Sequence, residues 1–391
     1  MSPFINNPPY PNNYGSEFLV IDRGEGCYLF DKKGNKYLDF GSGIAVNALG
    51  YGREDLAKTT YDQMLKLVHI SNLYATEPAV ELAKKLVSTG DFAAVHFGNS
   101  GTEANEAAFK YARAYSQRVK GEGNYKILSF SNAFHGRTFG TMSATPKEKY
   151  KAPFYPLVPG FETTTFNNVD ELKKVLNGSF AAVIIEPLQG EGGLESVTKE
   201  FCETLQNICV AENILIISDE VQTGLGRTGE LYGYQTFGLK PDIITLSKPL
   251  AGGLPLSATL IPSKVNDVIH VGEHGTTFGG GPVTTAVALK VLDIINNRDF
   301  LNNVKALSKY FKNGLQQIVN SCDNAIGVKG EGLLLGLQLK SEDLVPQIMT
   351  KCRENGLLVL RTGTDTLRFA PPLNITTQDI QVGLDILKKV L

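Results

Sequence analysis

Short apolar runs alternate with stretches of helical periodicity through the middle of the chain. The runs are rich in β-branched and aromatic residues, and glycine or polar residues follow most of them. Apolar runs of this length suit strands that are buried on both faces, and the helical stretches between them suit crossover connections. The alternation predicts an α/β fold with a mostly parallel sheet covered by helices on both faces. The predicted strands are 94–97, 126–130, 180–185, 214–218, 242–246 and 257–261.

A long amphipathic helix is predicted directly after the first of these strands. Small and aromatic residues recur there at spacings of three and four, which places them on one helical face. Ser100 or Thr102 is suited to cap its first turn, because a hydroxyl oxygen accepts from the free N–H groups at a helix start. The face consists of Ala104, Ala107, Ala108, Tyr111, Ala112 and Tyr115.

The two ends of the chain differ in pattern from the middle. Near the N-terminus a hairpin is predicted to turn at residues 33–35, and the C-terminal part mixes a long amphipathic helix (301–319) with short strands in GLLLGLQL and LLVLR. We therefore expect a smaller α+β domain built from residues 1–57 and 285–391. Residues 58–284 would form the large domain.

Composition narrows the class of partner. The chain has 391 residues, 42% hydrophobic and 20% charged, with a formal net charge of −2, which fits a globular protein and not a disordered or collagen-like one. Basic residues do not cluster, so nucleic acid is not an expected partner and a small molecule is. No apolar run reaches the 18 residues of a membrane span.

Cysteine usage and the N-terminus predict a cytoplasmic protein. The five cysteines are scattered and lack the spacing of metal ligands, so we expect reduced thiols and no metal site. The first residues show neither a secretory signal nor an arginine-rich transit pattern. An organellar enzyme whose presequence has been removed is the alternative.

The chemistry is expected where the predicted strands end, because ligands of open α/β sheets collect outside the carboxyl ends of the strands. Asp219 and Lys248 each follow one of the buried runs. An isolated lysine is usually a solvated surface charge. Together, however, an amine and a carboxylate so placed suit pyridoxal phosphate, whose aldehyde bonds to an amine and whose ring nitrogen needs a carboxylate.

Other segments at the strand ends suit the remaining parts of this cofactor. Gly98 to Thr102 forms a turn of small residues that opens a helix, a favourable place for a phosphate, although such a segment is often only a turn. Phe134 and Val221 are suited to pack on opposite faces of the ring, and Gln222 to bind its phenolic oxygen. His135 is left open between a packed and a hydrogen-bonded side chain.

Two further segments suit the binding of anionic groups. Arg137 offers a bidentate guanidinium to a substrate carboxylate. Thr276 and Thr277 lie in a glycine-rich loop whose hydroxyl and N–H groups suit an oxyanion, unless the loop is simply a surface turn.

The motifs NSGTEANEAA, FHGRT, EPLQGEGG, DEVQTGLGRTG and HGTTFGG, in this order with the lysine segment, resemble the class III aminotransferases of the fold-type I pyridoxal-phosphate family. The resemblance spans nearly the whole chain, from Tyr14 to LRFAPPLNI. It implies that Lys248 carries the cofactor and that Asp219 pairs with its ring nitrogen. The sequence departs from the family pattern at Gly281, where asparagine is usual, and in KPLAGG, where alanine usually follows the lysine.

The resemblance also implies further roles for residues at the site and a second subunit. Phe134 would stack on the ring, with Ser100, Gly101 and Thr102 at the phosphate and Arg137 at the substrate carboxylate. Thr277 would reach the cofactor of a neighbouring subunit, so that a homodimer shares its sites. Tyr14 and Thr276 would lie near the substrate, and Glu191 would pair with Arg368 and mask it.

Within the family, GIAVNALG, HISNLY and HGTTFGG are most similar to the branch that acts on N-acetylornithine. The expected reaction moves the terminal amine of that donor to 2-oxoglutarate. Branches acting on ornithine, succinylornithine or 4-aminobutyrate share much of the pattern and remain alternatives. An inert binding protein would not need both Lys248 and Asp219, and a nucleotide-dependent oxidoreductase would need GxGxxG after a strand, which GNSGTE does not supply.

Overall fold

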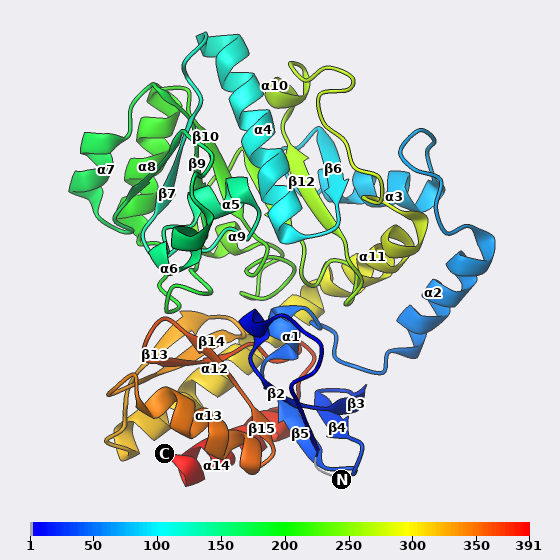
Figure 1. Ribbon diagram of the computed structural model, residues 1–391, viewed down its shortest axis with the longest axis vertical. Coiled ribbons are helices and arrows are strands. Elements are labelled where there is room, and N and C mark those ends of the chain that lie inside the picture. Colours follow the sequence, from blue (N-terminus) through cyan, green and yellow to red (C-terminus); the bar gives the residue numbers. More distant parts are fainter. Residues whose placement is uncertain (1–2) are drawn as a thin grey trace.

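The computed structural model describes residues 3–391 and shows two bodies of unequal size stacked along the long axis of the molecule (Figure 1). The larger body contains a seven-stranded sheet in the order β6-β12-β11-β10-β9-β7-β8. All its strands run in one direction except β12, which is antiparallel to both neighbours. The strands are β6 (Ala94–Gly98), β7 (Lys126–Phe130), β8 (Phe161–Thr164), β9 (Phe180–Ile185), β10 (Leu215–Asp219), β11 (Ile243–Leu246) and β12 (Ser257–Ile261).

The mostly parallel α/β sheet predicted from the sequence is confirmed, and six of its seven strands coincide with the predicted runs to within one or two residues. The strand that was missed is β8, an edge strand with the sequence FETT. Only one of its four residues is buried, and an edge strand does not need the continuous apolar run that marked the others.

Successive side chains of the central strands pack in two separate hydrophobic cores, one on each face of the sheet, because a strand has a two-residue period. Ala182 and Ile184 of β9 pack with the helix α4 (Gly101–Lys120) on one face, in a core that also holds Ala107, Ala108 and Tyr111. Val183 and Ile185 pack on the other face with α8 (Lys199–Ala211). The predicted apolar stripe of α4 is therefore confirmed, and Ser100 is its N-cap.

The other helices that begin before residue 290 are α1 (Ser42–Ala45), α2 (Glu54–Lys66), α3 (Glu77–Val87), α5 (Phe139–Ala144), α6 (Glu148–Lys151), α7 (Val169–Val175), α9 (Gly233–Phe237), α10 (Ser263–Asn266) and α11 (Pro282–Ile295), with 3-10 turns η1 (Asn12–Tyr14) and η2 (Ala152–Phe154). Of these, α1 lies in the smaller body (Figure 1).

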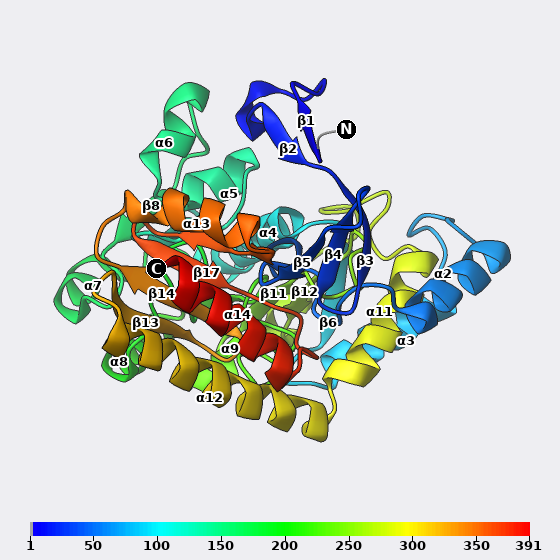
Figure 2. The ribbon, with the colours of Figure 1, turned by 90° about the horizontal axis from the view of Figure 1, so that it is seen from below.

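The smaller body joins the two ends of the chain. Strand β15 pairs in parallel with β5, so that Leu357 lies opposite Leu38, and Figure 2 shows the N-terminal strands beside the C-terminal helices. Its strands are β1 (Phe4–Asn6), β2 (Glu17–Leu19), β3 (Ile21–Glu25), β4 (Tyr28–Asp31), β5 (Lys36–Asp39), β13 (Ala325–Glu331), β14 (Leu334–Leu339), β15 (Leu357–Leu358), β16 (Leu360–Thr362) and β17 (Thr366–Phe369). Its long helices are α12 (Arg298–Ser321), α13 (Leu344–Glu354) and α14 (Thr377–Val390).

The hairpin predicted to turn at residues 33–35 is present as β4 and β5, and the predicted helix 301–319 lies within α12. The exact domain boundaries stay a prediction. Positions 57/58 and 284/285 fall inside α2 and α11, so any hinge at these points would interrupt a continuous helix.

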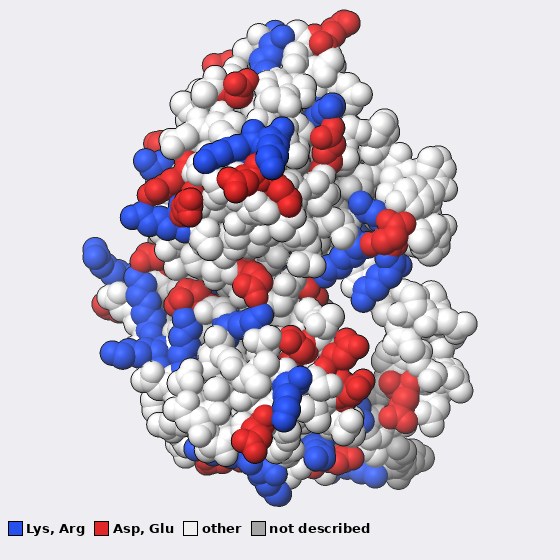
Figure 3. All heavy atoms as spheres, turned by 90° about the vertical axis from the view of Figure 1, so that its left-hand side faces the viewer, with Lys and Arg blue, Asp and Glu red and all other residues white. Residues whose placement is uncertain are grey.

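On the face shown in Figure 3, basic and acidic side chains are interspersed. None of the helices within residues 3–391 is long and apolar enough to cross a bilayer. The five cysteines are free thiols, as predicted.

Candidate active site

The carboxyl ends of the parallel strands meet along one edge of the large sheet, and the residues singled out from the sequence follow these ends. Strands β10 and β11 are paired in register, with Asp219 opposite Thr245. Lys248 lies in the turn just beyond β11 and Glu186 just beyond β9. The electrostatic influence of Asp219, Glu186, Glu191 and Arg368 reaches Lys248. The structure therefore brings these side chains into one charged cluster.

The ammonium of Lys248 loses its proton more readily than that of an ordinary lysine. Burial, together with the positive charge of Arg368, lowers its pKa to about 8. Within residues 3–391 it forms no ion pair. An amine with a lowered pKa and no paired carboxylate is a competent nucleophile toward an aldehyde.

Asp219, at the end of β10, is 5% exposed and is held by three donors. Its Oδ2 accepts from Asn105 Nδ2 at 2.9 Å and lies 2.8 Å from His135 Nδ1, and its Oδ1 accepts from the Val221 N–H at 3.1 Å. These three hydrogen bonds fix the orientation of the Asp219 carboxylate.

Asn105 and His135 are functional neighbours that sequence reasoning did not assign. Asn105 also donates to the His135 carbonyl oxygen at 2.8 Å and accepts from Thr245 Oγ1 at 2.8 Å. The signal that points to it is a lone amide within a stripe of alanines, because a buried amide needs partners. His135, left open from the sequence, is hydrogen-bonded to Asp219, and its Nε2 is buried without a partner in the described residues.

The start of α4 forms a small-residue cradle beside this cluster. A Cβ added to Gly101 would lie 2.7 Å from a methyl carbon of Val221, and one added to Gly136 would lie 2.4 Å from Thr102 Oγ1. Thr102 Oγ1 lies 2.6 Å from Thr141 Oγ1. The N-terminus of a 20-residue helix attracts an anion through its free N–H groups and dipole. The segment is therefore able to hold a phosphate, as predicted for Ser100, Gly101 and Thr102.

Glu191 and Arg368 form the ion pair that the family resemblance implies. Arg368, on β17, is 3% exposed, and its Nη1 donates to Glu191 Oε1 at 2.5 Å, to the Gly190 carbonyl oxygen at 2.7 Å and to Gln222 Oε1 at 3.2 Å. Burial raises the pKa of the Glu191 carboxyl, but the charge and hydrogen bond of Arg368 and the charges of Lys248 and Lys147 together bring it below its usual value. Gln222 thus contacts Arg368, and its predicted contact with a phenolic oxygen stays a prediction.

Glu186 is a second acidic residue of EPLQGEGG that the sequence did not single out. It is 5% exposed and accepts from the N–H of Phe134 at 2.9 Å and that of Gly190 at 3.1 Å. Burial raises the pKa of its carboxyl. Glu186 therefore fixes the main chain of two segments of the cluster.

Phe134 and Arg137 both lie against the ring of Tyr150. The Phe134 ring is partly buried and stands edge-on to Tyr150, with ring centroids 6.4 Å apart. Arg137 is exposed and lies over the Tyr150 ring, with its Cζ 3.7 Å from the centroid. Its guanidinium is held by stacking and forms no ion pair within residues 3–391, so it is free to bind a carboxylate.

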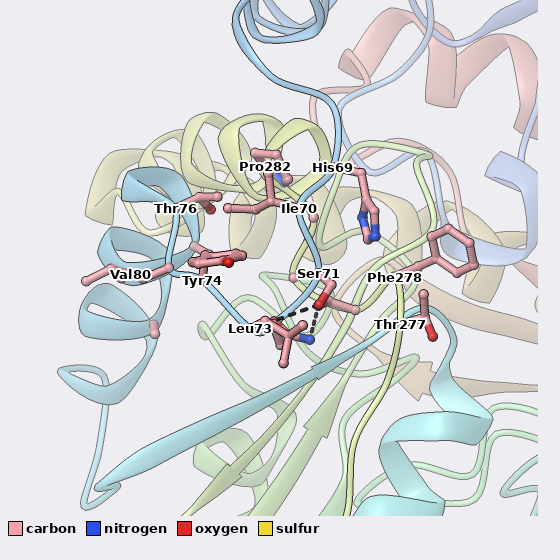
Figure 4. A pocket seen from close by; sticks show the side chains of 17 residues that line it. His69, Ile70, Ser71, Leu73, Tyr74, Thr76, Val80, Thr277, Phe278 and Pro282 are labelled. Atoms are coloured by element: carbon pink, nitrogen blue, oxygen red, sulfur yellow. Dashed lines mark hydrogen bonds between the residues drawn. The ribbon is translucent and has the colours of Figure 1, made fainter.

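Within residues 3–391, Tyr14, Thr276 and Thr277 make no hydrogen bond, ion pair or ring contact with the residues of the cluster. Tyr14 is exposed and packs against Tyr10. Thr277 is exposed beside Phe278 at a pocket formed by residues 69–83 and 277–282, which Figure 4 shows. Thr276 accepts from Asn72 through its carbonyl oxygen at 3.1 Å. The predicted roles of these three residues stay predictions.

Pyridoxal phosphate fits the chemical groups that this cluster presents. The cluster offers an unpaired amine at Lys248, a buried carboxylate at Asp219 and free N–H groups at the cradle, the three groups that the cofactor's aldehyde, ring nitrogen and phosphate require. The buried, unpartnered Nε2 of His135, with its other nitrogen on Asp219, marks an incompletely satisfied site.

Comparisons with known proteins agree with this geometry. The class III aminotransferase family model matches residues 10–391. The mitochondrial acetylornithine aminotransferase of Debaryomyces hansenii is 42% identical over 99% of this chain and 85% of its own length. A solved structure of ornithine aminotransferase from Toxoplasma gondii superposes with a TM-score of 0.91 at 30% identity, over 95% of this chain and 90% of that one.

A solved N-acetylornithine aminotransferase from Stenotrophomonas maltophilia has a TM-score of 0.84 at 33% identity, over 97% of this chain and 96% of that one. The family model matches the sequence of both bodies, and the matched residues include those of the cluster. The chain therefore belongs to the class III aminotransferases, a family of pyridoxal-phosphate-dependent transaminases.

Proposed function

We propose that the protein moves the terminal amine of N-acetylornithine to 2-oxoglutarate, giving N-acetylglutamate semialdehyde and glutamate, a step of arginine biosynthesis. The observation that carries the proposal is the buried Glu191–Arg368 pair beside Lys248. A donor that reacts at its terminal amine has no carboxylate next to the reacting carbon. It is therefore favoured by a pocket whose inner arginine is masked.

Each residue of the cluster has a definite task in this reaction. Bound pyridoxal phosphate supplies an aldehyde that accepts the amine and a ring that withdraws electrons from it. Asp219 would pair with the ring nitrogen, and the first turn of α4 would hold the phosphate. The Lys248 Nζ moves the proton from the amine-bearing carbon, because it is the basic group tethered beside the aldehyde. Arg137 holds the far carboxylate of the donor.

The keto acid differs from the donor in the position of its carboxylate, which lies directly beside the reacting carbon. We infer that Glu191 leaves Arg368 at this stage, so that the guanidinium binds the α-carboxylate of 2-oxoglutarate while Arg137 binds the distal one. Arg368 also donates to the Gly190 carbonyl oxygen and to Gln222, and these bonds do not depend on the Glu191 carboxylate. One pocket then serves both molecules.

Relative specificity for amino donors tests the proposed reaction. The kcat/KM for N-acetylornithine should exceed those for ornithine, succinylornithine and 4-aminobutyrate, with 2-oxoglutarate as the common acceptor. Ornithine is the competitor that the Toxoplasma gondii structure favours. A higher kcat/KM for any of these three donors would replace the proposed substrate with that one.

We expect Glu191→Ala to change which donor is used. With the masking carboxylate gone, Arg368 is open to α-carboxylates, and kcat/KM for glutamate relative to N-acetylornithine should rise about tenfold or more. Glu195→Ala is the matched control, because Glu195 lies four residues away and pairs with Lys329 at the surface. If Glu191→Ala lowers the melting temperature and leaves the donor ratio unchanged, the pair is only a structural brace.

We expect Arg137→Lys to weaken donor binding selectively. A lysine keeps the charge but loses the planar fork and its stacking on Tyr150, so the KM for N-acetylornithine should rise about tenfold while cofactor content is retained. Steady-state kinetics and the cofactor absorbance of the same preparation measure the two effects. Equal losses of both would contradict the role, and Arg23→Lys, at an exposed surface pair, serves as control.

The functional unit is proposed to be a homodimer that shares its sites. Large apolar side chains are exposed around the pocket of Figure 4, with Leu73 85%, Tyr74 71% and Phe278 67% accessible. An exposed apolar surface of this kind favours a protein partner, and a second copy resting there would bring Thr277 toward a neighbouring site. Light scattering that reports a monomer at assay concentration would overturn this.

A cytoplasmic location stays a prediction, and the Debaryomyces hansenii relative is named as mitochondrial. Imaging of the tagged protein in its own cells decides between the two.

A further inference from the structure

Lys147 lies beside the Glu191–Arg368 pair but has no part in the reaction described above. It follows α5 and directly precedes α6. Its Nζ donates to the carbonyl oxygen of Glu191 at 2.9 Å. Within residues 3–391 it forms no ion pair, although the negative charges of Glu191 and Glu186 both act on it. Lys147 is therefore a partly buried cation without a carboxylate of its own.

The two acidic residues near Lys147 differ in how firmly they are held. Both oxygens of Glu186 accept from main-chain N–H groups, of Phe134 and Gly190, and the side chain is almost fully buried. The Glu191 side chain is 27% exposed, and the bond recorded for its carboxylate is the one to Arg368. Glu191 is thus the carboxylate that is free to change partners.

The main chain of Glu191 is fixed while its side chain is not. Its carbonyl oxygen accepts from Lys147 Nζ and from the Gly363 N–H at 3.5 Å. A cation already bonded to the carbonyl oxygen of a glutamate lies within reach of that residue's own carboxylate after rotation about its side-chain bonds between staggered positions. No movement of the backbone is needed for the exchange.

A partner is required when the pair opens. A carboxylate that leaves a buried arginine without meeting another cation stays partly desolvated and uncompensated, and that state is strongly disfavoured. Burial lowers the pKa of the Lys147 ammonium, and within residues 3–391 this cation has no ion pair in the closed arrangement. The open state satisfies both groups at once.

We propose that Lys147 is the second partner of Glu191: the Glu191 carboxylate turns from Arg368 to the Lys147 ammonium and so frees Arg368 for the α-carboxylate of the keto acid. This inference rests on the proposed function and on the exchange at Arg368. Lys147 is a positioning residue, because it acts through Glu191 and touches no reacting atom. It sets the balance between the masked and the open pocket.

The predicted effect of removing the cation has a definite sign. Without Lys147 the open state loses its ion pair, so the masked state becomes more populated. Ligands that need Arg368 then bind more weakly, whereas the donor reaction at the masked pocket is affected much less. The probe is glutarate, which has the two carboxylates of 2-oxoglutarate and no keto group to react.

Glutarate binding to the holoenzyme should be measured by calorimetry for the wild type, Lys147→Met, Lys147→Arg, Glu191→Ala and the double variant Lys147→Met/Glu191→Ala. We expect Lys147→Met to raise the Kd for glutarate about fivefold or more, within the usual range of coupling between sites. Lys147→Arg should restore most of the affinity, and Lys147→Met should add almost nothing in the Glu191→Ala background. Lys149→Met, which removes an exposed lysine two residues away, is the matched control.

Two outcomes would overturn the proposal. An unchanged Kd in Lys147→Met means that Lys147 is not the partner. The second is a rise in Kd on adding Lys147→Met to Glu191→Ala that equals the rise in the wild-type background. That result means that Lys147 binds the ligand carboxylate itself or only supports the loop. Turnover of N-acetylornithine by the wild type, measured separately, tells these failures apart from a failure of the proposed function.

Discussion

Lys248→Ala should abolish transamination, with a loss of at least about 10³-fold in kcat. Lys147, a lysine near the cluster in the described part of the chain, does not replace it, because its Nζ is bonded to the Glu191 carbonyl oxygen. The substitution removes both the group that carries the cofactor and the base that moves the proton. Single-turnover kinetics with N-acetylornithine measure the loss.

A second readout separates this loss from misfolding. Borohydride reduction should fix the cofactor to the wild-type protein at the peptide that contains Lys248, and should fix none to the variant. Lys240→Ala, at an exposed position before β11, should behave as wild type. Turnover by Lys248→Ala near the wild-type rate would refute the assignment of this residue.

Asp219→Asn should cost about 10²-fold or more in kcat, which corresponds to about 2.7 kcal/mol of transition-state stabilisation. The amide keeps the size of the side chain but carries no charge to hold the ring nitrogen protonated. If the amide oxygen accepts from Asn105 and His135, the amide nitrogen takes the place of Oδ1, and the Val221 N–H is left without its acceptor. The half-reaction with N-acetylornithine and the absorbance of the bound cofactor measure the effect.

Asp242→Asn is the matched control for Asp219→Asn, since Asp242 lies at the opposite end of the same sheet and pairs with Lys264. A similar loss of stability in both variants, with activity lost only in Asp219→Asn, supports the chemical role. Activity of Asp219→Asn within a few-fold of the wild type would count against it.

The architecture was predictable because most of the sheet is buried on both faces. Strands such as FAAVII read as continuous apolar runs, and the alanine stripe of α4 has a clear helical period. The edge strand β8 lacks this pattern, since solvent replaces one neighbour and half of its side chains are only partly buried. Strand pairing between the two ends of the chain, as between Leu38 and Leu357, left no local signal.

The site was predictable as a set of motifs but not as a network of contacts. Asp219 and Lys248 follow their strands, so their meeting at one edge follows from the parallel sheet. The bonds of Asn105, His135 and Glu186 join segments far apart in the chain, and only the folded structure shows them. The same holds for Lys147, whose partner Glu191 lies 44 residues away. Gly281, where the family usually has asparagine, is the N-cap of α11 and provides no side-chain cap.

The most direct test of the account is a pair of half-reactions followed by absorbance on the purified holoenzyme. N-Acetylornithine alone should convert the bound cofactor to its amine form and release one equivalent of semialdehyde per site, and 2-oxoglutarate should then restore the original spectrum and release glutamate. Lys248→Ala should do neither. An unchanged spectrum with N-acetylornithine, under conditions where the cofactor is bound, would contradict the proposed function and the roles built on it.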